Sequence, residues 1–206
     1  MSIVLTTLFN GLAYGVLLFI MAVGLSVTMG MMRFANLAHV SLCMLGGYVA
    51  VTAMDSLGIP FLAALPAAFV VTGVFSIALE QLVLRHFYGS DDLTQVLLTI
   101  GIVFMSVASA AYLWGPEFRP VKVPVWLTGQ APVFGLMLER YRLFLVAFGA
   151  VITLVLLFGV ERTRFGAMVR ACVDNRRAAS ACGLNTHVVF ALTFAIGGGL
   201  AGLGGA

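Results

Sequence analysis

Side chains that could catalyse a reaction or hold a metal ion are few in this sequence, and they lie far apart. Its three histidines, His39, His86 and His187, fall in separate segments. None of them has a carboxylate or a second ligand at a spacing that would form an active site or a metal site. The three cysteines show no CxxC spacing, so they predict neither a zinc site nor a disulfide framework. We therefore expect no enzyme, no metal and no bound cofactor.

Nucleotide binding by this chain is not expected either. A Walker-type phosphate loop needs a lysine after a glycine-rich turn, whereas Lys122 is the single lysine of the sequence. If the protein uses ATP, a separate ATPase subunit must bind it. The net charge of +3 does not indicate nucleic-acid binding, because the basic residues of so apolar a chain mainly set its orientation in a membrane.

The segment "ERTRFGAMVRACVDNRRAASACGLN", residues 161–185, holds five of the eleven basic residues. Between Arg162 and Gly183 it has few β-branched residues and no proline, and Gly183 can take the left-handed conformation that ends a helix, so we predict a helix. Arg170 and Arg177, seven residues apart, share a face of that helix. An apolar face is supplied by Phe165, Met168, Val169 and Cys172. Such a helix lies on a membrane or binds a partner; the simpler alternative is a loop whose arginines contact anionic lipid, worth ~1 kcal/mol each, and fix the topology.

Three polar residues interrupt otherwise apolar stretches: Asn36, His39 and Glu80. Polar groups at membrane depth must be paired or must line a watery path, so all three are candidates for a translocation pathway. For Asn36 and His39 we favour the structural alternative, in which they cap a broken helix and bond to backbone. For Glu80 we favour pairing with Arg85 or with a polar group on another helix over a carboxylate that reaches out to water.

These residues must be positioned by membrane helices, because 62% of the 206 residues are hydrophobic and only 9% are charged. A span needs ~20 apolar residues to cross ~30 Å of hydrocarbon. Windows of that kind predict an all-α, polytopic transmembrane bundle with six spans near 3–31, 40–54, 60–84, 93–114, 143–160 and 187–206. The second window is only 15 residues long, so that helix is short, tilted or part of a broken helix, and we favour the last.

Alternation of these spans fixes an orientation once the arginine segment is placed in the cytoplasm. Arg33 and Arg85 then also lie inside, and the amino terminus lies outside, in agreement with the positive-inside tendency. The residues expected outside are Arg119, Lys122, Arg140 and Arg142. The proline-rich loop 115–142 should be extended over the membrane surface with Trp114 and Trp126 near the headgroups, either as a passive connector or as a surface for a soluble partner.

Glycine pairs at GxxxG spacing suggest where helices approach closely. They are Gly11 with Gly15 and Gly198 with Gly202. We read both pairs as helix-packing sites.

Two long blocks resemble the inner-membrane permeases of branched-chain amino acid ABC importers. One is the arginine segment followed by "HVVFALTFAIGGGLAGLGGA" (187–206), which looks like the family's cytoplasmic coupling segment and the helix after it. The other is "GLSVTMGMMRFANLAHVSLCMLGGYVA" (24–50), which resembles the family's Asn-x-Ala-His pattern leading into a Leu-Gly-x-Tyr helix. The chain departs from the family pattern at Val40 and Ser41, which leaves the substrate open, and has Arg177-Ala178-Ala179 where many importer permeases have Glu-Ala-Ala.

The resemblance implies a single permease domain, 1–206, in the bacterial inner membrane, with a coupling segment at 162–186. It also implies a second permease subunit, ATPase subunits that bind the ATP, an extracytoplasmic substrate-binding protein and membrane lipid as partners, with no nucleic acid. Residues expected to contact or position the ATPase are Arg162, Phe165, Arg170, Asp174, Arg177 and Gly183. Family members are longer, so we expect the chain to be incomplete at its carboxyl end.

The function implied is ATP-driven import of branched-chain amino acids or related small amino acids and amides by alternating access. Two alternatives belong to other classes. A secondary transporter or channel would need ion-coordinating or proton-relaying groups, for which Glu80 is the only support. An intramembrane enzyme would need a nucleophile with a base, which the spacing does not offer.

Overall fold

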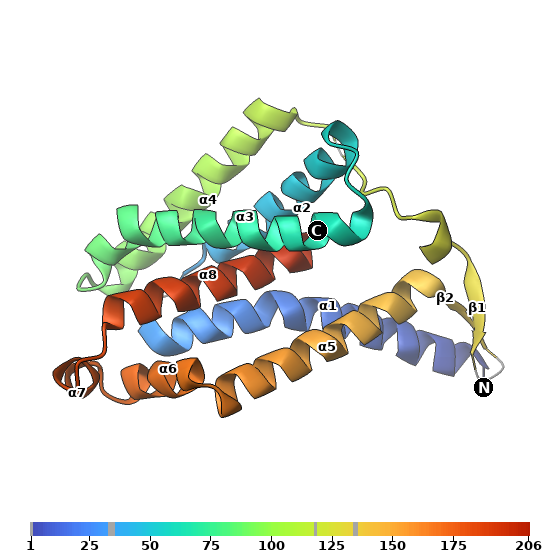
Figure 1. Cartoon of the computed structure of the whole chain (residues 1–206). Coiled ribbons are helices and arrows are strands. Elements are labelled where there is room, and N and C mark those ends of the chain that lie inside the picture. The colour runs from blue at the N-terminus through green and yellow to red at the C-terminus, as the bar shows by residue number, and fades with distance from the viewer. Residues whose placement is uncertain (1, 33–35, 118, 134–135) are drawn as a thin grey trace.

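The computed structural model describes residues 2–32, 36–117, 119–133 and 136–206, and these form a bundle of long helices (Figure 1). The long helices are α1 (Ser2–Met32), α2 (His39–Ser56), α3 (Phe61–Leu82), α4 (Asp92–Trp114), α5 (Arg140–Arg162) and α8 (Thr186–Gly205). The shorter elements are η1 (Leu84–Phe87), η2 (Val125–Leu127), β1 (Gln130–Val133), β2 (Leu136–Glu139), α6 (Arg164–Asp174) and α7 (Arg176–Ala181). The expected all-α bundle is confirmed.

Five helices are long and apolar enough to cross a membrane: Val4–Ser26 within α1, and all of α3, α4, α5 and α8. They correspond to five of the six predicted spans, and the chain is a multi-pass membrane protein. The sixth, α2, is not among the five, since its ends carry the polar residues His39 and Asp55. Its 18 residues correspond to about 27 Å of helix, a little less than the hydrocarbon thickness.

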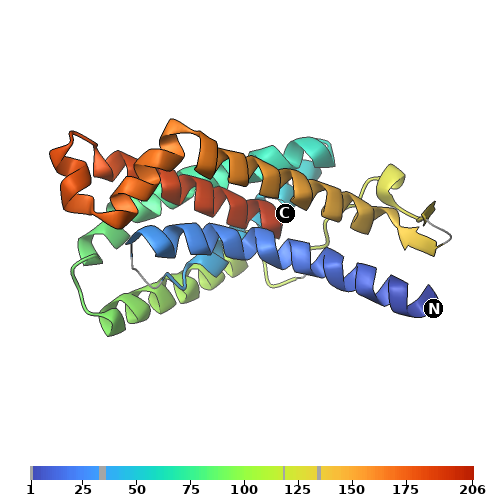
Figure 2. The ribbon, with the colours of Figure 1, turned by 90° about the horizontal axis from the view of Figure 1, so that it is seen from below.

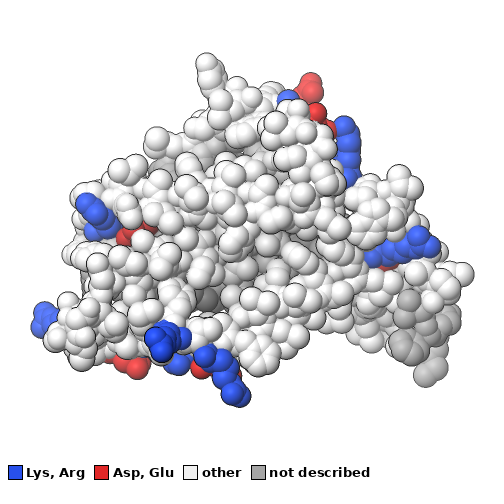
Figure 3. Space-filling model, in the orientation of Figure 1, with Lys and Arg blue, Asp and Glu red and all other residues white. Residues whose placement is uncertain are grey.

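Successive long helices alternate in direction, so that two ends of the bundle can be distinguished (Figure 1). We call them the α6–α7 end, which also holds η1, and the hairpin end, which holds η2, β1 and β2. The short helix α2 begins at the α6–α7 end, where α1 finishes, and runs back toward the hairpin end. The sequence left open whether this helix is short, tilted or part of a broken helix, and favoured the last. The structure shows a short, separate helix that does not continue α1. Charged side chains lie at the ends, with a broad uncharged band between them (Figure 3).

The centre of the bundle is α8, which packs against α1, α2 and α3. Its glycines make this possible: a Cβ at Gly202 would overlap the side chain of Thr72, and a Cβ at Gly46 of α2 would overlap the backbone of Gly202. The expected close approach at the second GxxxG pair is therefore confirmed. At Gly11 and Gly15, by contrast, a Cβ would meet nothing within 4 Å, so the first pair brings no described helix close.

The connection at the hairpin end is more ordered than the extended loop that the prolines predicted. Strands β1 and β2 pair antiparallel, with Gln130 opposite Glu139, and η2 precedes them. An ion pair of 2.7 Å between Lys122 Nζ and Asp55 Oδ1 fastens the loop to the end of α2. From this connection α5 runs back along α1 toward α6 (Figure 2).

Candidate functional site

The arginine segment leaves the membrane bundle at a sharp, capped corner between α5 and α6. Thr163 adopts an extended conformation there, and its Oγ1 accepts a hydrogen bond of 3.1 Å from the backbone N–H of Gly166. The same hydroxyl donates to the carbonyl of Gly159, in the last turn of α5. One side chain thus closes one helix and starts the next, which fixes the direction of α6.

A second corner lies within the segment, so the prediction of one continuous helix over 162–183 is wrong. The backbone is extended at Asn175, whose Oδ1 accepts a 3.0 Å hydrogen bond from the N–H of Ala178 and starts α7. Arg170 in α6 and Arg177 in α7 therefore do not share a face of one helix. An asparagine is among the strongest residues for starting a helix, so Asn175 was the sequence signal for this break.

The apolar face of the segment is buried against α8. Cys172 is 2% exposed and belongs to a cluster completed by Ala179, Val189 and Phe190. Met168 and Val169 pack against this cluster, as the helical spacing predicted, and Phe165 is half-buried. Because α6 and α7 share a core with the first turns of α8, the three helices form one packed unit.

The segment ends as the sequence predicted, at a glycine in the left-handed region. Gly183 has φ of +84°, and two residues later the side chain of Asn185 accepts from the N–H of Val188 at 3.3 Å to begin α8. These two residues turn the chain from α7 directly into the central helix of the bundle.

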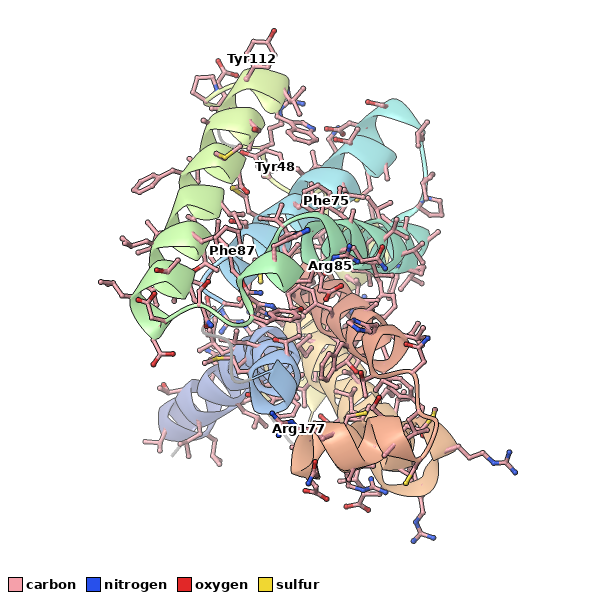
Figure 4. The ribbon with its side chains drawn as sticks, turned by 90° about the vertical axis from the view of Figure 1, so that its left-hand side faces the viewer. Tyr48, Phe75, Arg85, Phe87, Tyr112 and Arg177 are labelled. Carbon is pink, nitrogen blue, oxygen red and sulfur yellow. The ribbon has the colours of Figure 1, made fainter. Side chains whose placement is uncertain are left out.

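The charged side chains of the segment that the structure describes are exposed at the α6–α7 end, which faces the viewer in Figure 4. Arg162 is the last residue of α5, Asp174 the last of α6, and Arg177 lies in α7. Arg170 is held in place, because its guanidinium donates to the carbonyl of Val160. Apart from Arg170, these side chains form no ion pair or hydrogen bond that the described part of the chain contains, so their charge faces outward.

The two pathway candidates near the start of α2, Asn36 and His39, differ in their contacts. His39 is 4% exposed, and its Nε2 is hydrogen-bonded at 3.1 Å to the carbonyl oxygen of Met21 in α1. Asn36 is 2% exposed, yet neither its Oδ1 nor its Nδ2 has a partner among the described residues. Ala38, not Asn36, occupies the position before α2, so the asparagine does not cap that helix.

Glu80, the third candidate, lies in α3 and is hydrogen-bonded to the connection between α3 and α4. It is 5% exposed, and its carboxylate accepts a hydrogen bond of 2.6 Å from the hydroxyl of Tyr88, in the turn after η1. The described residues contain no ion pair between Glu80 and Arg85, and the Glu80 side chain is largely buried. The sequence carried no signal for Tyr88, because the contact depends on how η1 folds back under α3.

The fold and these sites can now be compared with known proteins. Residues 7–206 match the family described as the permease component of the branched-chain amino acid transport system. The chain belongs to this family. The resemblance found in the sequence is thereby confirmed, and the protein is a transport permease, the membrane subunit of an ATP-driven importer.

Curated relatives align with almost the whole chain. The permease is 27% identical to the high-affinity branched-chain amino acid transport system permease protein BraD of Pseudomonas aeruginosa, over 96% of this chain and 68% of that protein. It is 28% identical to LivH of Escherichia coli K12, over 98% of this chain and 69% of that protein. A probable LivH of Methanocaldococcus jannaschii is 26% identical over 95% and 63%, respectively. No solved structure matches the chain.

Proposed function

We propose that this permease acts in the bacterial inner membrane and imports branched-chain amino acids or related small amino acids and amides. In this proposal, residues 162–186, folded as α6 and α7, are the site at which an ATPase subunit docks. The observation that carries it is the two-sidedness of the segment: its apolar side is packed on α8, while Asp174 and Arg177 point outward. A purely topological loop would need neither the two caps nor the shared core.

Force on α6 and α7 would reach the membrane helices by direct packing. The segment shares its core with α8, and α8 in turn contacts α1, α2 and α3 along the bundle. Packed helices move as rigid bodies more readily than they deform. ATP-driven closure of two ATPase subunits would therefore rock the attached helices around a central pathway, which is alternating access.

The remaining partners are inferred from the family to which the chain belongs. With α6 and α7 in the cytoplasm, the hairpin end faces the outside and would receive the substrate-binding protein. A second permease subunit would complete the pathway between the two bundles, and anionic lipid would contact the exposed arginines.

Asn36, His39 and Glu80 stay candidates for the pathway. Asn36 has the strongest support, since both of its buried side-chain polar atoms lack a partner among the described residues. Buried polar groups are normally satisfied, and at membrane depth the usual alternative is contact with water or a passing solute.

The docking site can be tested by steric blockade. Ser180 of α7 is exposed, so a Ser180→Trp change adds bulk at the α6–α7 end without entering the core. We expect about a tenfold or larger loss of ATPase affinity, equivalent to about 1.4 kcal/mol, because the indole would hold the two proteins apart. The measurement is recovery of the ATPase with the affinity-tagged permease from detergent extracts.

Gly89→Trp is the matched control. Gly89 is an exposed turn residue at the same end of the bundle, and a Cβ there would meet nothing within 4 Å. Both variants should insert into the membrane normally. Full ATPase recovery with the Ser180→Trp variant, or equal losses with the two variants, would contradict docking at α7.

A further inference from the structure

Two backbone carbonyls in the last turn of α5 accept hydrogen bonds from side chains of the segment that follows. Thr163 Oγ1 donates to the carbonyl of Gly159, and Arg170 Nη1 donates to the carbonyl of Val160. The last four carbonyls of a helix lack partners within that helix. Because Thr163 is extended, with ψ of 157°, the N–H of Arg164 is turned away from the hydrogen-bond ladder of α5. Side chains of the segment therefore complete this end of α5.

Arg170 makes its contact at a distance from the corner. It lies about 9 Å along α6 from the first residue of that helix, Arg164. The cap at Thr163 sets the direction in which α6 leaves the corner, and a second attachment farther along resists rotation about it. The guanidinium suits this position, because it carries several N–H donors and a permanent charge, and the carbonyl end of a helix favours a cation.

A glycine allows α6 to come this close to the end of α5. Gly166 is buried, and a Cβ there would overlap the same Val160 carbonyl that Arg170 contacts. A charged side chain that met only the ATPase or lipid would require no such approach of the two helices. We call the contacts among Gly159, Val160, Thr163, Gly166 and Arg170 the α5–α6 joint.

The joint gives α6 a second neighbour besides α8. On one side Cys172 packs in the cluster shared with α8, and on the other Arg170 reaches α5, so that α6 lies between the end of α5 and the start of α8 (Figure 1). Helix α5 itself packs mainly on α1 and α6, and only 11% of its apolar window is buried in the bundle. A movement of α6 thus reaches α8 through an apolar core and α5 through the joint.

We propose that Arg170 is a positioning residue for transport: by donating to the Val160 carbonyl it holds α6 on the end of α5, so that both helices move together when the docking segment is displaced. The inference rests on the proposed function, since it takes ATPase docking at residues 162–186 from there and adds how the movement enters α5. The sequence had led us to expect Arg170 at the ATPase. Its guanidinium is instead used within the chain, whereas Arg177 forms no hydrogen bond among the described residues and is free for a partner.

Transport coupling tests this role in the assembled importer in lipid vesicles. Arg170→Met keeps an unbranched side chain but removes every donor, and Arg170→Lys keeps the charge and a donor. Arg85→Met is the matched control, because Arg85 is an exposed arginine of η1 at the same end of the bundle and has no hydrogen bond or ion pair among the described residues. The measurement is the number of leucine molecules imported per ATP hydrolysed, which does not depend on how much ATPase is bound.

We expect Arg170→Met to lower this ratio several-fold, because α6 would turn at the corner without carrying α5. Arg170→Lys should retain most of the ratio, since an ammonium group can donate to the same carbonyl, and Arg85→Met should match the wild type. An unchanged ratio in the Arg170→Met variant would overturn the inference. Loss of ATPase recovery at an unchanged ratio would overturn it too, since Arg170 would then be a contact of the ATPase.

A distance measurement tests the joint without ATPase or substrate. Spin labels are attached through Val151→Cys in α5 and Val173→Cys in α6, two exposed positions, and Cys182→Ser leaves only buried native thiols. Dilution with unlabelled permease in the vesicles restricts the recorded distances to those within one chain. Arg170→Met should broaden the distance distribution, and Arg170→Lys should leave it narrow. Equal widths for methionine and arginine would show that this contact does not hold α6.

Gly166→Ala disturbs the joint from its other side. The added methyl group would overlap the Val160 carbonyl and move α6 away, so the ratio of leucine to ATP should again fall several-fold. Combining this change with Arg170→Met should add little, because both changes act on one contact. Fully additive losses would contradict a shared joint.

The two proposals fail in different experiments. Full ATPase recovery with the Ser180→Trp variant defeats docking at α7, whatever the spin labels report. If the ATPase docks there, and the Arg170→Met variant keeps both the narrow distribution and the wild-type ratio, only the positioning role of Arg170 is defeated.

Discussion

The helices α8 and α4 have similar length and apolarity, yet the fold uses them in opposite ways. Both qualify as membrane spans, but 61% of the apolar window of α8 is buried inside the bundle, against 11% of that of α4. The residues of α8 that face its neighbours include glycines, so three helices reach its backbone. The inward face of α4 instead carries long apolar side chains and serines, which line a cavity.

The difference shows that hydropathy alone does not define the role of a membrane helix. In lipid, helices associate where small residues allow close packing, because apolar side chains gain little by leaving lipid for protein. A glycine-rich helix therefore becomes the centre, and α6 and α7, the segment proposed to bind the ATPase, are attached to it. A helix with large side chains stays at the edge, fixed by a few polar contacts at its ends.

The largest effect is expected when the close packing of α8 is disrupted. Gly202→Leu would drive a side chain into Thr72 of α3, and overpacking of this kind costs about 1–3 kcal/mol. We expect a clear drop in the melting temperature of the detergent-solubilised protein. The measurement is size-exclusion chromatography of samples heated to increasing temperatures. Gly11→Leu is the control, because a Cβ at Gly11 has open space around it. Equal stability of the two variants would show that α8 is not the packing centre.

Weakening the attachment of α4 at the hairpin end should lower the stability by a smaller amount. Thr52→Val keeps the shape of the side chain but removes the oxygen that accepts from Trp114, so we expect a loss of about 1 kcal/mol. A shift in tryptophan fluorescence should accompany it, since the indole N–H would lose its partner. Thr52→Ser retains the hydroxyl and should behave like the wild type. If valine and serine gave the same spectrum and stability, this hydrogen bond would not fasten α4.

The smallest effect concerns the start of α4. Hydrogen bonds from the side chain and the backbone N–H of Thr94 lower the pKa of Asp91 below its ordinary value. An acid whose pKa is lower in the folded state stabilises that state at neutral pH, and this contribution is lost as the pH falls below the ordinary aspartate value through the lowered one. Thermal melts from pH 6 down to about pH 3 should show it as a slight acid sensitivity that Asp91→Asn removes, because asparagine caps equally well without titrating. Identical pH profiles would contradict this.

The predictions for residues 162–186 show which structural features local sequence patterns can determine. The left-handed Gly183 and the apolar face around Cys172 depend on helix geometry and were predicted correctly. The break at Asn175 was missed, although an asparagine before "RRAA" is a local capping signal that competes with helix propensity. The partner of Glu80 could not be predicted, since Tyr88 reaches it only after η1 has folded under α3.

The sequence by itself determined that this chain is a multi-pass helical protein, where most of its spans lie and which segment carries the basic residues, because these follow from apolar length and local periodicity. Only the tertiary structure decided which glycine pair is a packing site, that the buried Ser41 hydroxyl has no hydrogen-bond partner among the described residues, and that a cavity separates α4 from α2 and α3. The physical reason is that these properties belong to the faces two or three helices turn toward one another. Residues 41, 75 and 106 come together only when the whole bundle has formed.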